Sequence, residues 1–172
     1  LYYSVTNQIL ESVKNLGSKV TFIGRANIGL HKVLDSYNNE TLVTNPNYLF
    51  SLSVKTIENK YADLFYSEEV SNLLKENKII VSELTAQQYS LNTGDKLVLV
   101  GMNEVVTELE IGKIVPDSEI GWFEALVSKK IGYELGINRN IQAIIWDTKV
   151  TENHFVELYK NIKYKQLLSL IH

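Results

Sequence analysis

The chain has 172 residues, of which 45% are apolar, 10% aromatic and 22% charged. These values are typical of a folded globular protein of about one domain, and they exclude a disordered or collagen-like chain. The formal net charge is −3, without the basic excess that nucleic-acid binding requires, so we expect no nucleic-acid partner. The absence of cysteine excludes disulfides and thiolate metal ligands.

The first stretch of the chain shows helical spacing of its apolar residues. Four of them, spaced by four, four and three positions, predict an amphipathic helix that ends at Gly17: Val5, Ile9, Val13 and Leu16. No apolar run of the chain approaches the length of a membrane-spanning helix, so we expect no membrane insertion by this chain itself.

Residues 19–54 alternate between extended and turn patterns. The β-branched segment 19–24 predicts a strand, residues 25–34 a short helix, and the polar segment 35–40 a turn. A second turn is expected at 45–47, around Pro46, before a half-buried strand over 49–54.

Two helices and a buried strand are expected next. Composition and spacing predict helices over 56–65 and 67–76, and residues 78–82 form a short continuous apolar strand. Ser82 is a suitable N-cap for a further helix over 83–89.

A turn and a hairpin follow that helix. Gly94 lies in a polar turn at 92–95, where it permits a backbone conformation that a side chain resists. Residues 96–100 and 105–115 are predicted to form an antiparallel hairpin around Gly101, and Pro116 ends its second strand.

The rest of the chain continues the alternation. We expect a strand over 124–127, a helix over 128–135, a strand over 141–146 and mostly helix over 151–172. The hairpin and the lack of a regular βαβ rhythm favour an α+β fold, with a mixed, largely antiparallel sheet and packed helices. We expect a single domain over 1–172, taken from a longer chain, because the sequence starts at Leu1 and stops inside an apolar-periodic stretch.

The sequence contains no recognisable catalytic, metal or cofactor motif. Its three histidines, His31, His154 and His172, are far apart in sequence, and none belongs to a local metal-binding pair. The glycines form no phosphate-binding loop, and no serine lies in a nucleophile turn. We therefore expect no catalytic residue, no metal and no cofactor in this chain.

One loop combines charge with large aromatic residues. Asp117 and Glu119 precede Trp122 and Phe123, at the point where the chain enters the strand expected over 124–127. The aromatic pair either closes the sheet as a core plug or forms an exposed partner-binding tip. A rival interpretation is an enzyme, or its regulatory part, in which the acidic loop and Trp122 line a small-molecule cleft.

Two segments resemble a known family. Residues 80–99, IVSELTAQQYSLNTGDKLVL, and 109–115, LEIGKIV, are similar to the MacB-like periplasmic core domain of FtsX-type permeases. Residues 116–128, PDSEIGWFEALVS, resemble a variant of this domain that precedes VanY-type D-Ala-D-Ala carboxypeptidase domains. The matched positions build the fold, so no functional residue is transferred from either family.

The resemblance implies a non-catalytic interaction or adaptor domain of a bacterial cell-envelope protein. It places the chain outside the cytoplasm, periplasmic or at the cell surface, membrane-anchored or secreted, with a protein or a cell-wall component as its partner. Membrane helices outside this chain fit the permease family. The alternative is an accessory or regulatory part of a D-Ala-D-Ala carboxypeptidase-type peptidoglycan hydrolase whose catalytic domain lies outside this chain, because the zinc motif is missing here.

Overall fold

The computed structural model describes residues 2–4, 19–42, 50–137 and 141–146. The chain forms two compact units, one of residues 1–22 with 141–172 and the other of residues 23–140. In the first unit, β1 (Tyr2–Ser4) pairs antiparallel with β9 (Ile141–Trp146), which confirms the strand expected over 141–146. The expected helices before Gly17 and over 151–172, and the turn at 45–47, lie outside the described residues.

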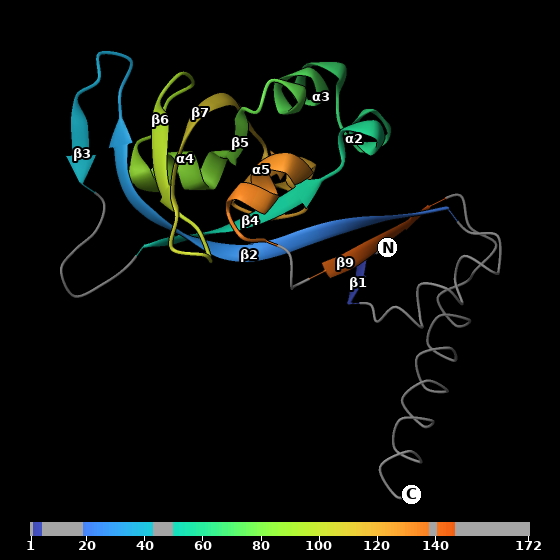
Figure 1. Ribbon diagram of the computed structural model, residues 1–172. Coiled ribbons are helices and arrows are strands. Elements are labelled where there is room, and N and C mark those ends of the chain that lie inside the picture. Colours follow the sequence, from blue (N-terminus) through green and yellow to red (C-terminus); the bar gives the residue numbers. More distant parts are fainter. Residues whose placement is uncertain (1, 5–18, 43–49, 138–140, 147–172) are drawn as a thin grey trace, which may run out of the picture. The chain divides into compact units, whose positions relative to one another are not determined.

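The second unit is a closed β-barrel with short helices around it (Figure 1). Its strands follow the order β2-β4-β8-β5-β7-β6, and β6 pairs back onto β2. Their bounds are β2 Lys19–Leu34, of which the part from Ile23 belongs to this unit, β4 Ser51–Ile57, β5 Ile79–Ser82, β6 Lys96–Val100, β7 Val106–Val115 and β8 Ala125–Ser128. The fold therefore contains helices and a mixed sheet, as expected for α+β, but the sheet closes on itself.

The expected short helix over 25–34 is wrong, because those residues continue β2. Ala26, Ile28 and Leu30 all face the core, a period of two that belongs to a strand. Residues 25–29 pair with β4, residues 29–34 pair with β6, and residues 32–34 also pair with β3, so partner strands bind the backbone polar groups along this whole segment.

The turn after β2 is confirmed. The Asp35 carboxylate accepts hydrogen bonds from the backbone amides of Tyr37 at 2.8 Å and Asn39 at 2.9 Å, which fixes the reversal into β3 (Glu40–Leu42). These hydrogen bonds lower the pKa of Asp35, chiefly through the amide of Asn39, because they favour the charged carboxylate.

The predicted hairpin is also confirmed. β6 and β7 pair antiparallel, with Leu97 opposite Leu109, and β7 begins one residue later than expected. The strand expected over 78–82 is β5, and it runs parallel to β7 and antiparallel to β8. The barrel thus combines parallel and antiparallel pairs.

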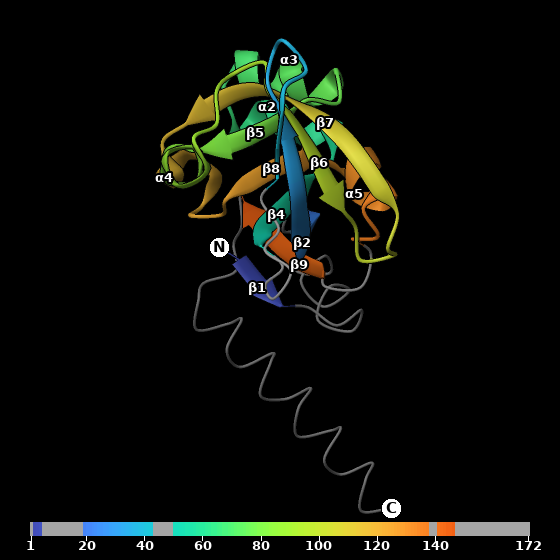
Figure 2. The ribbon, with the colours of Figure 1, turned by 90° about the vertical axis from the view of Figure 1, so that its left-hand side faces the viewer.

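The barrel has an approximate two-fold relation in its strand pairing. Exchanging β2 with β6, β4 with β7 and β5 with β8 leaves every pair and its direction unchanged. Both β5 and β8 end at a serine that caps a helix. Ser82 Oγ accepts from the Thr85 amide at 3.2 Å before α4 (Glu83–Tyr89), and Ser128 Oγ accepts from the Ile131 amide at 3.3 Å before α5 (Lys129–Glu134). Figure 2 shows these helices on opposite flanks of the barrel.

The connection from β4 to β5 carries two helices, α2 (Asn59–Phe65) and α3 (Glu68–Lys75). The helix expected over 67–76 is confirmed, with Ser67 as its N-cap. The helix expected over 56–65 starts later, because Thr56 and Ile57 pair with β8 as the end of β4.

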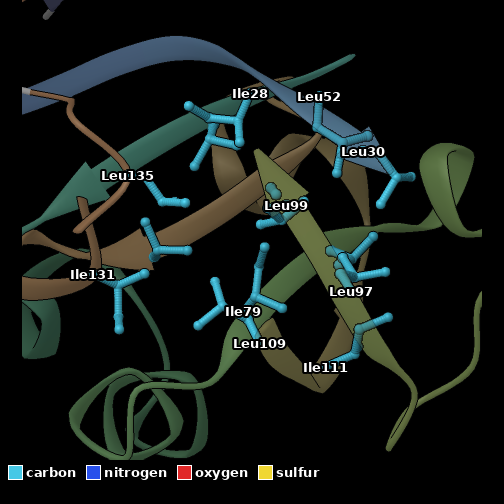
Figure 3. Close-up of a cluster of buried hydrophobic side chains, with 14 of the residues drawn as sticks. Ile28, Leu30, Leu52, Ile79, Leu97, Leu99, Leu109, Ile111, Ile131 and Leu135 are labelled. Carbon is cyan, nitrogen blue, oxygen red and sulfur yellow. The ribbon is translucent and has the colours of Figure 1, made fainter. Parts of the chain in front are cut away.

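The barrel interior is filled by branched aliphatic side chains from every strand and from α5 (Figure 3). Ile28, Leu30, Leu52, Leu97 and Leu99 are all fully buried there. Burying such side chains stabilises the fold by about 1.5 to 3 kcal/mol each, before the entropy of ordering them is counted.

Gly94 is expected to resist substitution. Its φ is +91°, and a Cβ added there meets no atom within 4 Å, so the cost of a side chain is conformational rather than steric crowding. We expect Gly94→Ala to lower the free energy of unfolding by about 1 kcal/mol in urea denaturation. Thr93→Ala, an exposed neighbour, is the control, and equal stability of the two variants would contradict the turn argument.

Candidate functional site

The connection from β7 to β8, residues 116–124, is named here the Trp122 loop. A short 3₁₀ helix, η1 (Asp117–Ile120), opens it after Pro116. Gly121 and Trp122 follow with φ of +65° and +64°, two successive left-handed residues that reverse the chain. The Trp122 amide donates to the Asp117 carbonyl at 2.9 Å and closes the reversal.

Side-chain and backbone hydrogen bonds fasten both ends of the Trp122 loop. Asp117 Oδ1 accepts from the Leu84 amide at 3.1 Å, which ties the loop to α4. Glu124 Oε1 accepts from the Ser53 amide at 3.1 Å, and the Glu124 amide donates to the Ser53 carbonyl at 3.0 Å, which ties it to β4. Ile120, 1% exposed, anchors the middle. The loop is therefore fastened to α4 and β4 by contacts within the chain itself, without a partner.

The structure separates the two aromatic residues of the loop. Trp122 is 73% exposed, so a core plug at this position is excluded, and Phe123 is half-buried against the barrel. The left-handed backbone of Gly121 and Trp122 reverses the chain directly after the buried Ile120. Trp122 lies within this reversal and is therefore exposed, whereas Phe123 follows it. Asp117 is half-buried and Glu119 is exposed.

Phe123 covers a buried lysine that the sequence analysis did not identify. Lys55 Nζ lies 5.6 Å from the centroid of the Phe123 ring and 5.6 Å from that of Tyr66. Arg25, opposite Lys55 in the β2–β4 register, places its guanidinium 5.6 Å from the same Phe123 ring. Each arrangement is a cation–π contact.

Lys55 is fully buried, and this desolvation lowers its pKa to about 8. In the sequence it alternates with Leu52, Val54 and Thr56 in a way that indicates the outer face of a strand. Lys55 is nevertheless buried, because Tyr66 and Phe123 cover this outer face. Such coverage is a tertiary feature that a strand pattern does not contain.

A pocket of about 230 Å³ lies between the start of α3 and η1. Its lining comes from three parts of the barrel unit: Phe65, Tyr66, Ser67 and Val70, then Val115, then Glu119 and Ile120. Trp122 and Asp117 are not among these residues. This pocket is therefore not the cleft lined by Trp122 that the enzyme interpretation requires. Glu119 is the one carboxylate among its described lining residues.

Within residues 2–4, 19–42, 50–137 and 141–146 there is no group of three or more His, Cys, Asp or Glu side chains with metal-binding geometry. His31 is exposed on β2, and His154 and His172 lie outside the described residues. No helix of that same described part is long and apolar enough to cross a bilayer.

No protein-family model matches the chain, and no curated protein sequence matches it. The resemblance to the MacB-like domain therefore stays a prediction. The residues that carry it form β5, α4, β6 and most of β7.

Lys55→Met is expected to stabilise the protein near neutral pH. Below pH 8 the folded protein bears the full cost of burying the ammonium, so we expect the variant to unfold with a free energy higher by about 1 to 3 kcal/mol. Between pH 8 and about 10.5 the unfolded chain binds more protons than the folded one, so wild-type stability rises with pH and the gap narrows. Urea denaturation of both proteins across this range measures the gap. A gap that stays constant with pH would contradict a lowered pKa.

Trp122→Gly is expected to leave the fold intact. The side chain is mostly exposed and the backbone is left-handed, so glycine relieves strain while little apolar burial is lost. We expect a free energy of unfolding equal to wild type or higher by up to about 1 kcal/mol. In a separate variant, Trp146→Phe with Trp122 retained, Trp122 is the single tryptophan, and its emission should be that of a solvent-exposed indole. A loss of about 3 to 5 kcal/mol, typical of a buried aromatic, would contradict this assignment.

Proposed function

We propose that this chain is a non-catalytic interaction domain of a bacterial cell-envelope protein, that it works outside the cytoplasm, and that it binds a protein partner through the Trp122 loop. The observation that carries the proposal is the exposure of Trp122, 73%, on a loop fastened to both α4 and β4. Tryptophan is the residue type most enriched among the side chains that dominate binding energy.

The backbone at Trp122 strengthens this argument. A left-handed conformation costs a residue with a side chain about 1 kcal/mol or more, and an exposed ring returns little of that cost by burial. A fixed loop also lowers the entropy lost on association, because the anchor is ordered beforehand. Both features are those of a docking residue and are unfavourable for a residue with a purely structural role.

The neighbourhood of Trp122 favours a protein over a cell-wall glycan. Leu84, 60% exposed, lies on α4 beside the same Asp117 that the Trp122 amide contacts. Leu84 and Trp122, both with exposed apolar side chains, thus bond through their amides to one acidic residue, and such apolar residues suit the centre of a protein interface. The location outside the cytoplasm is supported by the MacB-like resemblance of residues 80–99 and 109–115.

Site-specific cross-linking tests the proposal. With p-benzoylphenylalanine at position 122 and irradiation in envelopes of the source cells, we expect one protein adduct of defined mass. Tyr37, 86% exposed at the β2–β3 turn, is the matched control position and should not give this adduct. Excess unlabelled wild-type chain should abolish the adduct, whereas excess Trp122→Gly chain should not.

Three outcomes would contradict the proposal. They are the absence of an adduct, the same adducts at positions 37 and 122, and an adduct removed by a muramidase but not by a protease. The last outcome would identify a cell-wall glycan as the partner.

A further inference from the structure

Two residues with exposed apolar side chains, Leu84 and Trp122, are joined through η1 to the pocket. Leu84, Asp117, Glu119 and Trp122, together with the pocket beside Glu119, are named here the docking surface. Asp117 links its apolar members, since its side chain accepts from the Leu84 amide at 3.1 Å and its carbonyl from the Trp122 amide at 2.9 Å. Two residues further along η1, Glu119 lines the pocket. The docking surface therefore combines two exposed apolar residues and a recess that are connected through η1.

The pocket has the shape and lining to take one long side chain. Its volume of about 230 Å³ exceeds that of several water molecules and falls below that of a typical ligand site. Val70, Val115 and Ile120, all at most 2% exposed, supply apolar wall, and the Glu119 carboxylate lies at the exposed side. An apolar stem that ends in a polar or charged head matches this lining.

The charges around the pocket favour a cationic head. Lys113 Nζ lies 2.7 Å from Glu69 Oε2, and its pKa is raised, first by the hydrogen bond to Glu69 and further by the charges of Glu69 and Glu119. One ammonium group therefore lies in the field of two carboxylates, which leaves a net negative charge. Asp117, two residues before Glu119 on η1, adds a further carboxylate to the same loop, and Glu83 is exposed next to Leu84 on α4.

Lys55 and Arg25 are cations that oppose this preference. Arg25 is exposed and contacts the Phe123 ring of the Trp122 loop, but it does not line the pocket. Lys55 lies 5.6 Å from the Tyr66 ring, and Tyr66 lines the pocket whereas Lys55 does not. Because Lys55 is fully buried, its ammonium does not reach the surface that a partner covers. A partner that covers the acidic rim without bringing cations leaves the carboxylates desolvated and unpaired, which costs affinity.

We propose that the docking surface binds an apolar segment of the protein partner that carries an arginine or lysine, and that this cationic side chain enters the pocket beside Glu119 while the flanking apolar residues contact Leu84 and Trp122. This inference rests on the proposed function, since it states the chemistry of the partner for the same site.

Two peptides that differ in one charge test the inference. The probes are acetyl-Gly-Leu-Arg-Leu-Gly-amide and the same peptide with citrulline, the neutral isostere of arginine, titrated into the ¹⁵N-labelled chain. We expect the arginine peptide to shift the indole signal of Trp122 and the amide signals of Glu119 and Ile120 saturably. The citrulline peptide should bind about tenfold more weakly, the factor typical of a charge-assisted contact.

A pair of variants gives the same comparison from the protein side. Glu119→Gln should reduce the affinity for the arginine peptide to that of the citrulline peptide. Glu104→Gln, an exposed carboxylate in the β6–β7 turn, is the matched control and should bind like wild type. The ¹⁵N spectra of the free variants verify that both fold.

Equal binding of the two peptides, an unchanged affinity of Glu119→Gln, or no shift at these signals up to millimolar peptide would each overturn the inference. The cross-linking experiment at position 122 is independent of the peptides. If its protein adduct forms while the peptides fail, the chemistry inferred for the partner is wrong and the proposed function stands. If the adduct is also absent, both are wrong.

Discussion

The barrel closes because β2 pairs along both of its edges. It has 16 residues, and its later half meets β4 on one side and β6 on the other. Without the second of these contacts the strands would form an open sheet with two exposed edges. Closure brings the β4–β5 and β7–β8 connections to fixed positions, and the candidate site is made of those two connections. The pairing of β2 with β6, with Leu30 opposite Leu99, therefore helps to position the site.

Local signals predicted much of this fold, and nonlocal pairing explains what they missed. Ser82, Ser67 and Gly94 act through hydrogen bonds and backbone angles within a few residues, so their roles follow from sequence. The continuation of β2 through residues 25–34 depends on pairing with β4 and β6, which lie further along the chain. The sequence predicted β6 with the correct bounds, but it did not show that β6 pairs with β2. Neighbouring residues therefore carry no signal of closure.

The candidate site divides in the same way. Composition singled out the loop that holds Asp117, Glu119, Trp122 and Phe123, because acidic and aromatic residues there are conspicuous in the sequence. Whether each aromatic side chain is exposed depends on the left-handed backbone at Gly121 and Trp122. Only at Gly121 does the residue type, glycine, indicate such a conformation. The sequence did not indicate the burial of Lys55, because the side chains that cover it come from the β4–β5 connection, with Tyr66, and the β7–β8 connection, with Phe123.

The two-fold relation of the strands gives the pocket a particular place. The β4–β5 connection is the counterpart of the β7–β8 connection under the exchange that relates the two halves of the barrel. Phe65, Tyr66 and Val70 come from the first connection, and Glu119 and Ile120 from the second, so the pocket lies between two connections that the exchange relates to each other. Neither half forms it alone. Because both halves of the barrel must be folded for the pocket to exist, a ligand bound there stabilises the whole barrel against unfolding. The same binding free energy thus serves recognition and couples the folding of the two halves.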